Sequence, residues 1–202
     1  MELILASTSP RRREILSLLR VPFSVVAPEA DEDEPLKDPV ALARRLARKK
    51  ALSVFKKHRN AAVVGADTVV YFKGRVLGKP KDEQEALEML KALSGRWHTV
   101  VTGVAVYSPK GKVVFHDTAR VKFRPFDEEE ALYYVKTGEP LDKAGAYGVQ
   151  GFGATLVEKI RGNFYTVMGL PVHRLYEELK KLGVVNLRGA ERWSSPSAPR
   201  GS

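Results

Sequence analysis

The 202-residue sequence contains no cysteine, only four histidines and no long apolar run. Without cysteine, the chain has no disulfides, no thiolate zinc site and no cysteine nucleophile. No apolar stretch approaches the roughly 18 residues that a membrane-spanning helix requires. The first charges follow a very short apolar stretch, which is the reverse of the order in a secretory signal. We therefore expect a cytoplasmic protein without a membrane partner.

Charge of one sign is in excess. The sequence has 34 Lys and Arg against 24 Asp and Glu, for a net charge of +10, in a composition typical of globular proteins. Such an excess favours polyanionic partners, namely nucleic acids, nucleotides or acidic surfaces. A solvated, lysine-rich surface would give the same composition. The positions of the charges have to distinguish these two interpretations.

Strand-like and helix-like segments alternate along the chain. The strands are expected at residues 2–6, 23–27, 61–72, 97–107, 112–123 and 156–160. The helices are expected at residues 10–20, 39–58, 82–95, 127–138 and 171–182, three of them behind an aspartate cap. This alternation, with a hairpin across 97–123, predicts an α/β fold with a mixed sheet.

Length and composition suit a single domain over residues 1–186, or two tightly merged lobes. The remaining segment, residues 187–202, is poor in residues that form a core. We expect it to be a disordered tail.

The predicted helix 39–58 carries eight Lys or Arg and no acid across residues 39–60. At about 100° per residue, Lys50 falls in the middle of the apolar stripe of this helix. The stripe consists of Ala43, Leu46, Ala47 and Val54. An inward lysine requires an anion, because an unpaired buried charge is very unfavourable. A lysine that extends along a shallow helix to reach solvent is the alternative; we favour the anion.

Two arginines stand at the start of the first helix. Arg11 and Arg12 follow the turn Ser-Thr-Ser-Pro at residues 7–10. Cations in the first helical turn oppose the helix dipole, so a bound anion would be favourable there. A strand, a hydroxyl-rich turn and a helix N-terminus together form a typical phosphate-binding site. The alternative is that these arginines pair with the acidic loop at residues 29–34.

Asp67 interrupts an otherwise apolar strand. A carboxylate at this position either caps a turn or takes part in chemistry, because sites in α/β proteins assemble at strand ends. Together with Glu32 or Asp31 it could bind Mg²⁺, which prefers a few carboxylates plus phosphate oxygens. The histidines show no zinc-ligand spacing.

Two glycine-rich segments imitate known motifs without matching them. Residues 74–80, Gly-Arg-Val-Leu-Gly-Lys-Pro, are one residue short of a Walker A loop and end in Pro80 instead of Ser or Thr. The glycines of residues 145–153 do not form GxGxxG before a helix. Lys79, held between glycine and proline, is still well placed to meet an anion.

Seven segments together resemble the Maf family of nucleoside triphosphate pyrophosphatases, a family related in fold to the inosine triphosphate pyrophosphatases. In chain order they are LASTSPRRREIL, RLARKKA, VVGADTVV, VLGKP, LSGRWHTVVTGVAV, PLDKAGAYGVQG and NFYTVMGLP. The form DKAGAYGVQG resembles the branch that acts on dTTP and UTP, not the branch that acts on 7-methyl-GTP. The family is also labelled septum formation inhibitor, after a role in cell division.

The resemblance assigns roles to positions that match the family motifs. It implies that Asp67 is the general base. Substrate choice is assigned to Arg11, Thr68 and Gln150. Phosphate binding is assigned to Ser7, Arg12, Lys50 and Lys79. Asp142 and Lys143 are further pocket residues, and the metal, Mg²⁺ or another divalent cation such as Mn²⁺, is assigned to Glu32 and Asp67. The loop at 29–34 is more acidic than the motif requires, so Asp31 stays an alternative to Glu32.

The resemblance also implies an elongated mixed sheet with flanking helices around a central cleft, in a homodimer. The implied reaction converts dTTP and UTP to the monophosphate and pyrophosphate, which removes modified pyrimidine nucleotides. One alternative is an ITP or XTP pyrophosphatase on the related fold. Another is a non-catalytic nucleic-acid-binding protein or cell-division regulator. The nucleic-acid alternative predicts affinity that falls steeply with salt, and it explains neither the inward Lys50 nor Asp67, so no stable nucleic-acid partner is expected.

Overall fold

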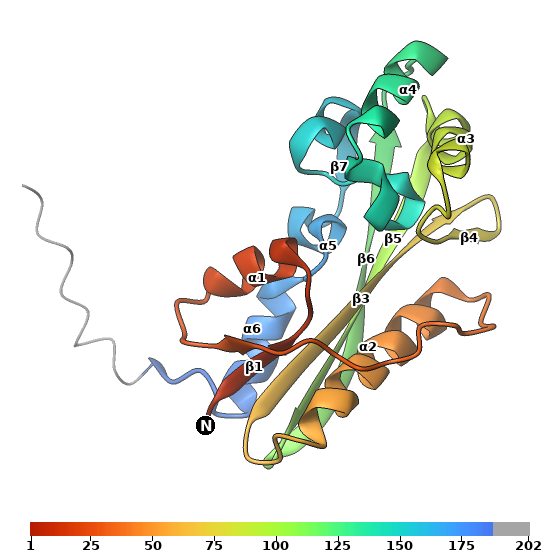
Figure 1. The fold of residues 1–202 in the computed structure, drawn as a ribbon. Coiled ribbons are helices and arrows are strands. Elements are labelled where there is room, and N and C mark those ends of the chain that lie inside the picture. Colours follow the sequence, from red (N-terminus) through yellow and green to blue (C-terminus); the bar gives the residue numbers. More distant parts are fainter. Residues whose placement is uncertain (188–202) are drawn as a thin grey trace, which may run out of the picture.

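A mixed seven-stranded sheet runs through the computed structural model, which describes residues 1–187 (Figure 1). The strands are β1 Leu3–Ala6, β2 Ser24–Val25, β3 Ala62–Phe72, β4 Arg75–Leu77, β5 Trp97–Ser108, β6 Gly111–Phe123 and β7 Val157–Arg161. Their order is β2-β1-β3-β5-β6-β7, and β4 also pairs with β3. The pairs β2–β1 and β1–β3 are parallel, and the other pairs are antiparallel. The predicted mixed α/β fold is confirmed.

Helices and short 3₁₀ turns connect these strands. The helices are α1 Pro10–Ser17, α2 Pro39–Phe55, α3 Glu83–Leu93, α4 Glu128–Lys136, α5 Phe164–Met168 and α6 Val172–Lys181. The 3₁₀ turns are η1 Glu139–Asp142, η2 Ala144–Ala146 and η3 Gly151–Thr155. Within residues 1–187, none of the helices combines the length and the apolar character needed to cross a membrane.

The sequence pattern missed β4 and α5 and made β2 too long. β4 lies inside the segment that imitates a Walker A loop, and the turn at Lys73 and Gly74, both with positive φ, makes that segment a hairpin. α5 has only five residues, too few to show a helical period. β2 has two residues instead of the five expected. The tail predicted at 187–202 lies, beyond Leu187, outside the described residues.

Three helices begin at the predicted aspartate caps. The carboxylates of Asp38, Asp82 and Asp127 accept hydrogen bonds from backbone N–H groups three residues further on, at distances of 2.7, 2.8 and 2.9 Å. Each bond satisfies an N–H group that has no partner inside the helix. The cap at Asp38 fixes the start of α2, the helix that carries Lys50.

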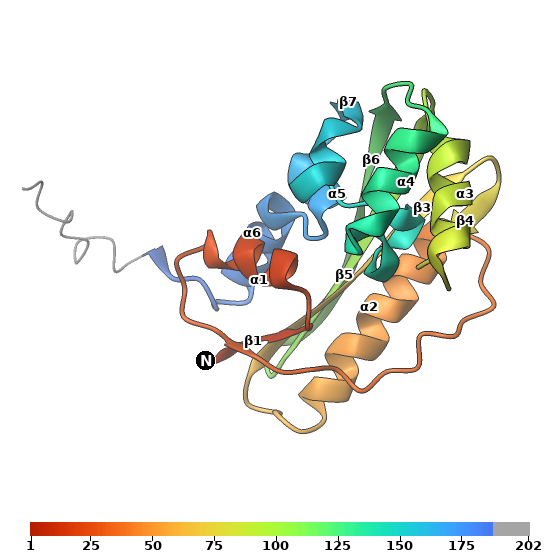
Figure 2. The ribbon, with the colours of Figure 1, turned by 45° about the horizontal axis from the view of Figure 1, so that its top comes forward.

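The two faces of the sheet bury different sets of helices (Figures 1 and 2). α2 packs alone on one face, over Val63 and Ala105. Residues of α1, α3, α4, α5 and α6 belong to the core on the other face, together with Val64 and Val104. Because side chains alternate along a strand, consecutive residues of β3 face opposite sides of the sheet.

α2 lies unusually close to the sheet because two strand residues have no side chain. A Cβ on Gly65 would lie 2.6 Å from the carbonyl oxygen of Ala47, and a Cβ on Gly103 would overlap the backbone of Ala43. The helix presents alanines to both strands. This close approach brings the side chain of Lys50, which lies between these alanines and Ala51, onto β3.

One edge of β3 is only partly paired. β1 pairs with β3 up to Gly65, opposite Ala6, and the pairing of β3 with β4 begins at Val70, opposite Leu77. Between these two points, residues 66–69 face no strand on that edge in the described part of the chain. The sheet therefore has a gap beyond the carboxyl end of β1, where the turn at residues 7–9 leads into α1.

Gly65→Ala tests the contact between α2 and the sheet. The added methyl group would push α2 away, so we expect a loss of about 1–3 kcal/mol or more in the free energy of unfolding. Gly78→Ala is the control, because nothing lies within 4 Å of its Cβ position. Urea unfolding of both variants measures the difference, and equal stabilities would contradict the proposed close contact.

Candidate functional site

A cavity of about 300 Å³ lies at the gap beside β3. Its lining comes from the turn after β1, the start of α1, the middle of α2, β3 and the segment after β4. Residues 142–144 and 147–149 and the end of α5 complete it. Charged groups meet apolar side chains here, including Val70, Val100 and Val149. Such a combination suits a ligand that is ionic at one part and hydrophobic at another.

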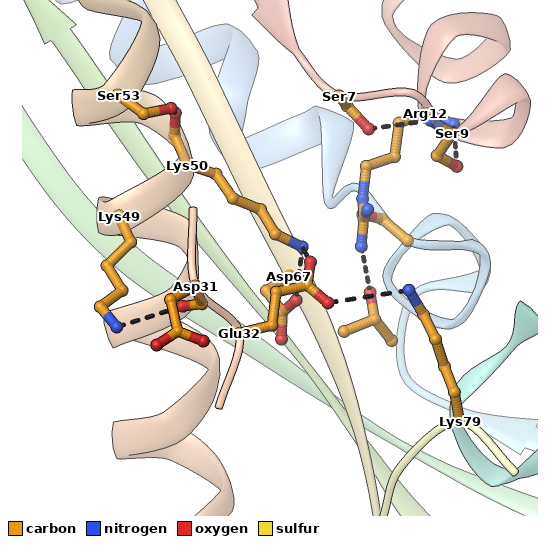
Figure 3. Close-up of polar contacts among 12 residues, drawn as sticks. Ser7, Ser9, Arg12, Asp31, Glu32, Lys49, Lys50, Ser53, Asp67 and Lys79 are labelled. Carbon is orange, nitrogen blue, oxygen red and sulfur yellow. Dashed lines mark hydrogen bonds and ion pairs between the residues drawn. The ribbon is translucent and has the colours of Figure 1, made fainter. Parts of the chain in front are cut away.

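Lys50 lies at the centre of the charged groups (Figure 3). Its side chain is buried, and its Nζ lies 2.9 Å from Asp67 Oδ1 and 2.7 Å from Glu32 Oε1. Lys79 Nζ lies 3.7 Å from the other carboxylate oxygen of Glu32. Lys50 turns inward, as the sequence pattern indicates, and the anions that it meets here are two carboxylates of this chain.

The two carboxylates have different electrostatic environments. Burial raises the pKa of Asp67 above its ordinary value, although Lys50 and Arg12 act in the opposite direction. Partial burial also acts to raise the pKa of Glu32, but Lys50, Lys79 and Arg12 together lower it below its ordinary value. Two acids whose pKa values are moved apart are suited to different roles. Asp67 is suited to accept a proton, and Glu32 is suited to remain an anion.

The carboxylates also fit a divalent cation. Both approach the same ammonium group within 3 Å, so their oxygens face one common point occupied here by a positive charge. No set of three or more Asp, Glu or His side chains suited to a metal converges anywhere in residues 1–187. Mg²⁺ commonly binds to one or two carboxylates and completes its coordination with water and substrate phosphates. Asp31 does not line the cavity, and its side chain accepts a hydrogen bond from the backbone of Asp33.

Arg12 is fixed on the opposite side of β3 from Lys50. Its Nε donates to the carbonyl oxygen of Gly169 at 2.8 Å, and its Nη2 donates to Thr68 Oγ1 at 3.1 Å. Ser9 caps α1 by accepting from the backbone N–H of Arg12 at 3.4 Å. Arg11 lines the same cavity. β3 thus presents Asp67 to one side and Thr68 to the other, and both reach the cavity through the gap.

The acidic loop pairs with α2 instead of α1. Glu34 forms ion pairs with Arg45 and Lys49, and Glu29 pairs with Lys57 at 2.9 Å. Within residues 1–187 no ion pair joins this loop to Arg11 or Arg12, and Glu32 acts on Arg12 through the longer-range attraction of their charges. The same ion pairs neutralise part of the basic face of α2.

The remaining predicted residues divide into two groups. Ser7, Asp142 and Lys143 line the cavity. Lys143 Nζ donates to Asp142 Oδ1 at 2.8 Å and to the carbonyl oxygen of Glu139 at 2.7 Å. Gln150 does not line the cavity, and its Nε2 donates to Glu14 Oε2 at 3.2 Å. The neighbours of Gln150, Gly148 and Val149, form the wall instead.

The sequence did not single out the apolar part of the lining. Val70, Val100 and Met168 look like ordinary core residues in the sequence, because their patterns are those of a buried strand and a short helix. Tyr147 also lines the cavity, with its hydroxyl 2.6 Å from Nε2 of the buried His98. No local signal separates a valine that faces a cavity from one that faces the core.

Comparison with known proteins now decides the family. Residues 2–182 match the family described as Maf-like protein. The chain belongs to the Maf family. A relative from Aquifex aeolicus (strain VF5), named dTTP/UTP pyrophosphatase, is 56% identical over 92% of this chain and 97% of its own. Relatives of the same name from Symbiobacterium thermophilum and Bacillus cytotoxicus are each 49% identical, over 90% and 88% of this chain and 94% of their own.

One solved structure is a more distant match. The Staphylococcus aureus Ham1 protein aligns with a TM-score of 0.47 and 14% sequence identity, over 78% of this chain and 80% of that chain. Membership in the Maf family rests on the sequence matches and not on this distant likeness.

Lys50→Met tests the charge arrangement in this Maf protein. Without the ammonium group, the pKa of Asp67 in the folded state should rise further. Ionisation of Asp67 then lowers stability as the pH rises through that pKa, and this effect disappears below about pH 3.9, where the unfolded carboxyl is also protonated. We expect a loss of about 3 kcal/mol at pH 8 relative to the unsubstituted protein, shrinking toward pH 4.

Urea unfolding between pH 4 and pH 8 measures this effect. Lys49→Met on the same helix is the control, because the Lys49 side chain is more exposed than that of Lys50, at 35% against 11%, and its ion pair with Glu34 should contribute at most about 1 kcal/mol. A stability difference for Lys50→Met that did not change with pH would contradict the arrangement.

Proposed function

We propose that this protein hydrolyses dTTP and UTP to the nucleoside monophosphate and pyrophosphate. The observation that carries the proposal is the buried Lys50 between Asp67 and Glu32, in the same cavity as Arg12. Such a cluster combines a candidate base with charges that bind phosphate. The names of the Aquifex, Symbiobacterium and Bacillus relatives support the choice of substrate.

Four cations would bind the triphosphate. Arg11, Arg12, Lys50 and Lys79 line one cavity, together with the hydroxyl-bearing turn that starts at Ser7. Enzymes of phosphoryl transfer act mainly by positioning the phosphates and stabilising their charge. The N-terminus of α1 adds backbone N–H groups with a favourable dipole. This arrangement uses the arginines whose position at a helix start is otherwise unfavourable.

Asp67 would orient a water molecule and accept its proton. The water oxygen forms a bond to the α-phosphorus, the bond from that phosphorus to the bridging oxygen breaks, and pyrophosphate leaves. A base works best when its pKa approaches the working pH. The burial that raises the pKa of Asp67 moves it in this direction.

Glu32 and Asp67 would hold a divalent cation, for which we propose Mg²⁺ or Mn²⁺. When bound, such an ion neutralises charge on the phosphate oxygens. Glu32 is suited to this role because nearby cations keep its pKa low, so it is ionised at neutral pH. Lys50 contacts both carboxylates and so holds them close together.

The apolar lining would hold the nucleoside. Val70, Val100 and Val149 offer flat hydrophobic contact to a pyrimidine ring. Arg11, Thr68 and Gln150 are the proposed residues of substrate choice, with Asp142 and Lys143 nearby. The homodimer is proposed from the family resemblance alone, and the cytoplasmic location from the composition of the sequence.

A nucleic-acid-binding role is less well supported. It depends on the basic face of α2 being free for phosphates. Arg45, Lys49 and Lys57 on this helix and its C-terminal end already pair with Glu34 and Glu29.

Pyrophosphate release from a panel of nucleoside triphosphates tests the proposed reaction. We expect release from dTTP and UTP with Mg²⁺, none with EDTA, and little from purine nucleotides. Asp67→Asn should lower turnover by about 10² or more, the usual contribution of a general base. Asp33→Asn, in the exposed acidic loop, should keep normal turnover. Release mainly from ITP or XTP would favour the alternative of an ITP or XTP pyrophosphatase. Near-normal turnover of Asp67→Asn would exclude Asp67 as the general base.

Gln150→Ala tests the proposed role of Gln150. An amide offers a donor and an acceptor that match the edge of uracil or thymine, so this change should reduce pyrimidine selectivity more than turnover. In the structure the amide is bound to Glu14, so Glu14→Ala should release it and leave selectivity intact. Selectivity follows from kcat/KM for UTP against GTP. Equal losses on every nucleotide after Gln150→Ala would remove this residue from base recognition.

A further inference from the structure

Thr102 is a fully buried polar residue to which neither the proposed reaction nor the motif analysis gives a role. It lies on β5, and its side chain has no exposure to solvent. Its Oγ1 contacts the backbone carbonyl oxygen of Thr166 at 2.8 Å and Thr68 Oγ1 at 2.8 Å. A buried hydroxyl with two partners on different elements connects those elements.

The chemistry of the partners fixes the direction of each hydrogen bond. The carbonyl oxygen of Thr166 can only accept a hydrogen bond, so the hydroxyl of Thr102 donates its one proton to this oxygen. Thr68 must therefore donate to Thr102. The oxygen of Thr68 is then left to accept, and it accepts from Arg12 Nη2 at 3.1 Å. The guanidinium donates to Thr68, Thr68 donates to Thr102, and Thr102 donates to the backbone of α5.

The second attachment of Arg12 depends on the same threonine. Arg12 Nε donates to the carbonyl of Gly169, directly after α5. α5 contains Thr166, whose backbone Thr102 holds against the sheet. Thr102 therefore supports both groups that orient the guanidinium, one on β3 and one beyond α5. The remaining side-chain N–H groups of Arg12 form no hydrogen bond within residues 1–187, so they can meet a ligand in the cavity that Arg12 lines.

We propose that Thr102 is a positioning residue, which acts through Thr68 and α5 to hold Arg12 for the phosphates of the substrate. This inference rests on the proposed function, in which Arg12 binds the triphosphate. Thr102 does not line the cavity, so it acts on the substrate only through these contacts. Its hydroxyl, and not its shape, is the group that matters.

Thr102→Val removes the hydroxyl and keeps the shape of the side chain. We expect KM for dTTP to rise about tenfold, because Thr68 and α5 would no longer be held in place and Arg12 would be less well oriented for the phosphates. Thr102→Ser restores the hydroxyl and should restore KM. If Thr102 served only the stability of the fold, Thr102→Val would reduce the fraction of folded enzyme. The apparent kcat would then fall and KM would stay unchanged. Thr99→Val is the control on the same strand, since the structure shows no side-chain hydrogen bond from Thr99 in residues 1–187.

A double-mutant cycle with Arg12→Ala shows whether Thr102 acts through Arg12. If it does, Thr102→Val lowers kcat/KM in the presence of Arg12 and has no further effect in the Arg12→Ala background. Independent, multiplicative losses would overturn the proposal, and so would a serine variant that fails to restore KM. If the valine variant does not fold, Thr102→Ala replaces it in the same cycle, with circular dichroism as the check on folding.

The unsubstituted protein separates this proposal from the proposed function. If it releases no pyrophosphate from any nucleotide, the proposed function is wrong. The same cycle is then measured as affinity for inorganic pyrophosphate by calorimetry. If Thr102→Val lowers the affinity for pyrophosphate only when Arg12 is present, the positioning role of Thr102 is still supported. Unchanged affinity would overturn it.

Discussion

The ammonium group of Lys50 between two carboxylates is the interaction on which the site depends. A buried cation is tolerated only with anionic partners, and these partners come from β3 and from the loop before α2. The two elements must therefore lie close to α2. The glycines of β3 and β5 meet this requirement by letting the helix rest directly on the sheet. Packing and electrostatics thus impose the same constraint.

Arg12 forms a second and separate group on the other side of β3. Its hydrogen bonds go to Thr68 and to the backbone after α5, so it belongs to the layer of α1 and α5 and not to that of α2. The gap between β1 and β4 is what allows both groups to share one cavity. A continuous strand along this edge of β3 would separate them by the full thickness of the sheet.

Much of the fold followed from local patterns, because caps and hydrophobic periods are local. Asp38, Asp82 and Asp127 begin the helices predicted from them. Lys50 was recognisable because a charge in an apolar stripe conflicts with its surroundings. Thr102 gave no such signal, since a threonine in a β-branched strand fits its context. Its importance depends on Thr68 and Thr166, which are distant in the sequence.

The pairing of β3 with β5 has a consequence for the accuracy of folding. Asp67 lies opposite Gly103, and Thr68 lies opposite Thr102. A shift of one residue in this register would turn each side chain to the other face. Asp67 would then point toward α1 and away from Lys50, and Thr68 would lose both Thr102 and Arg12. Gly65 would also no longer lie under α2, so a slipped chain would lose the helix contact together with the site. The same packing that forms the site therefore also disfavours the shifted register.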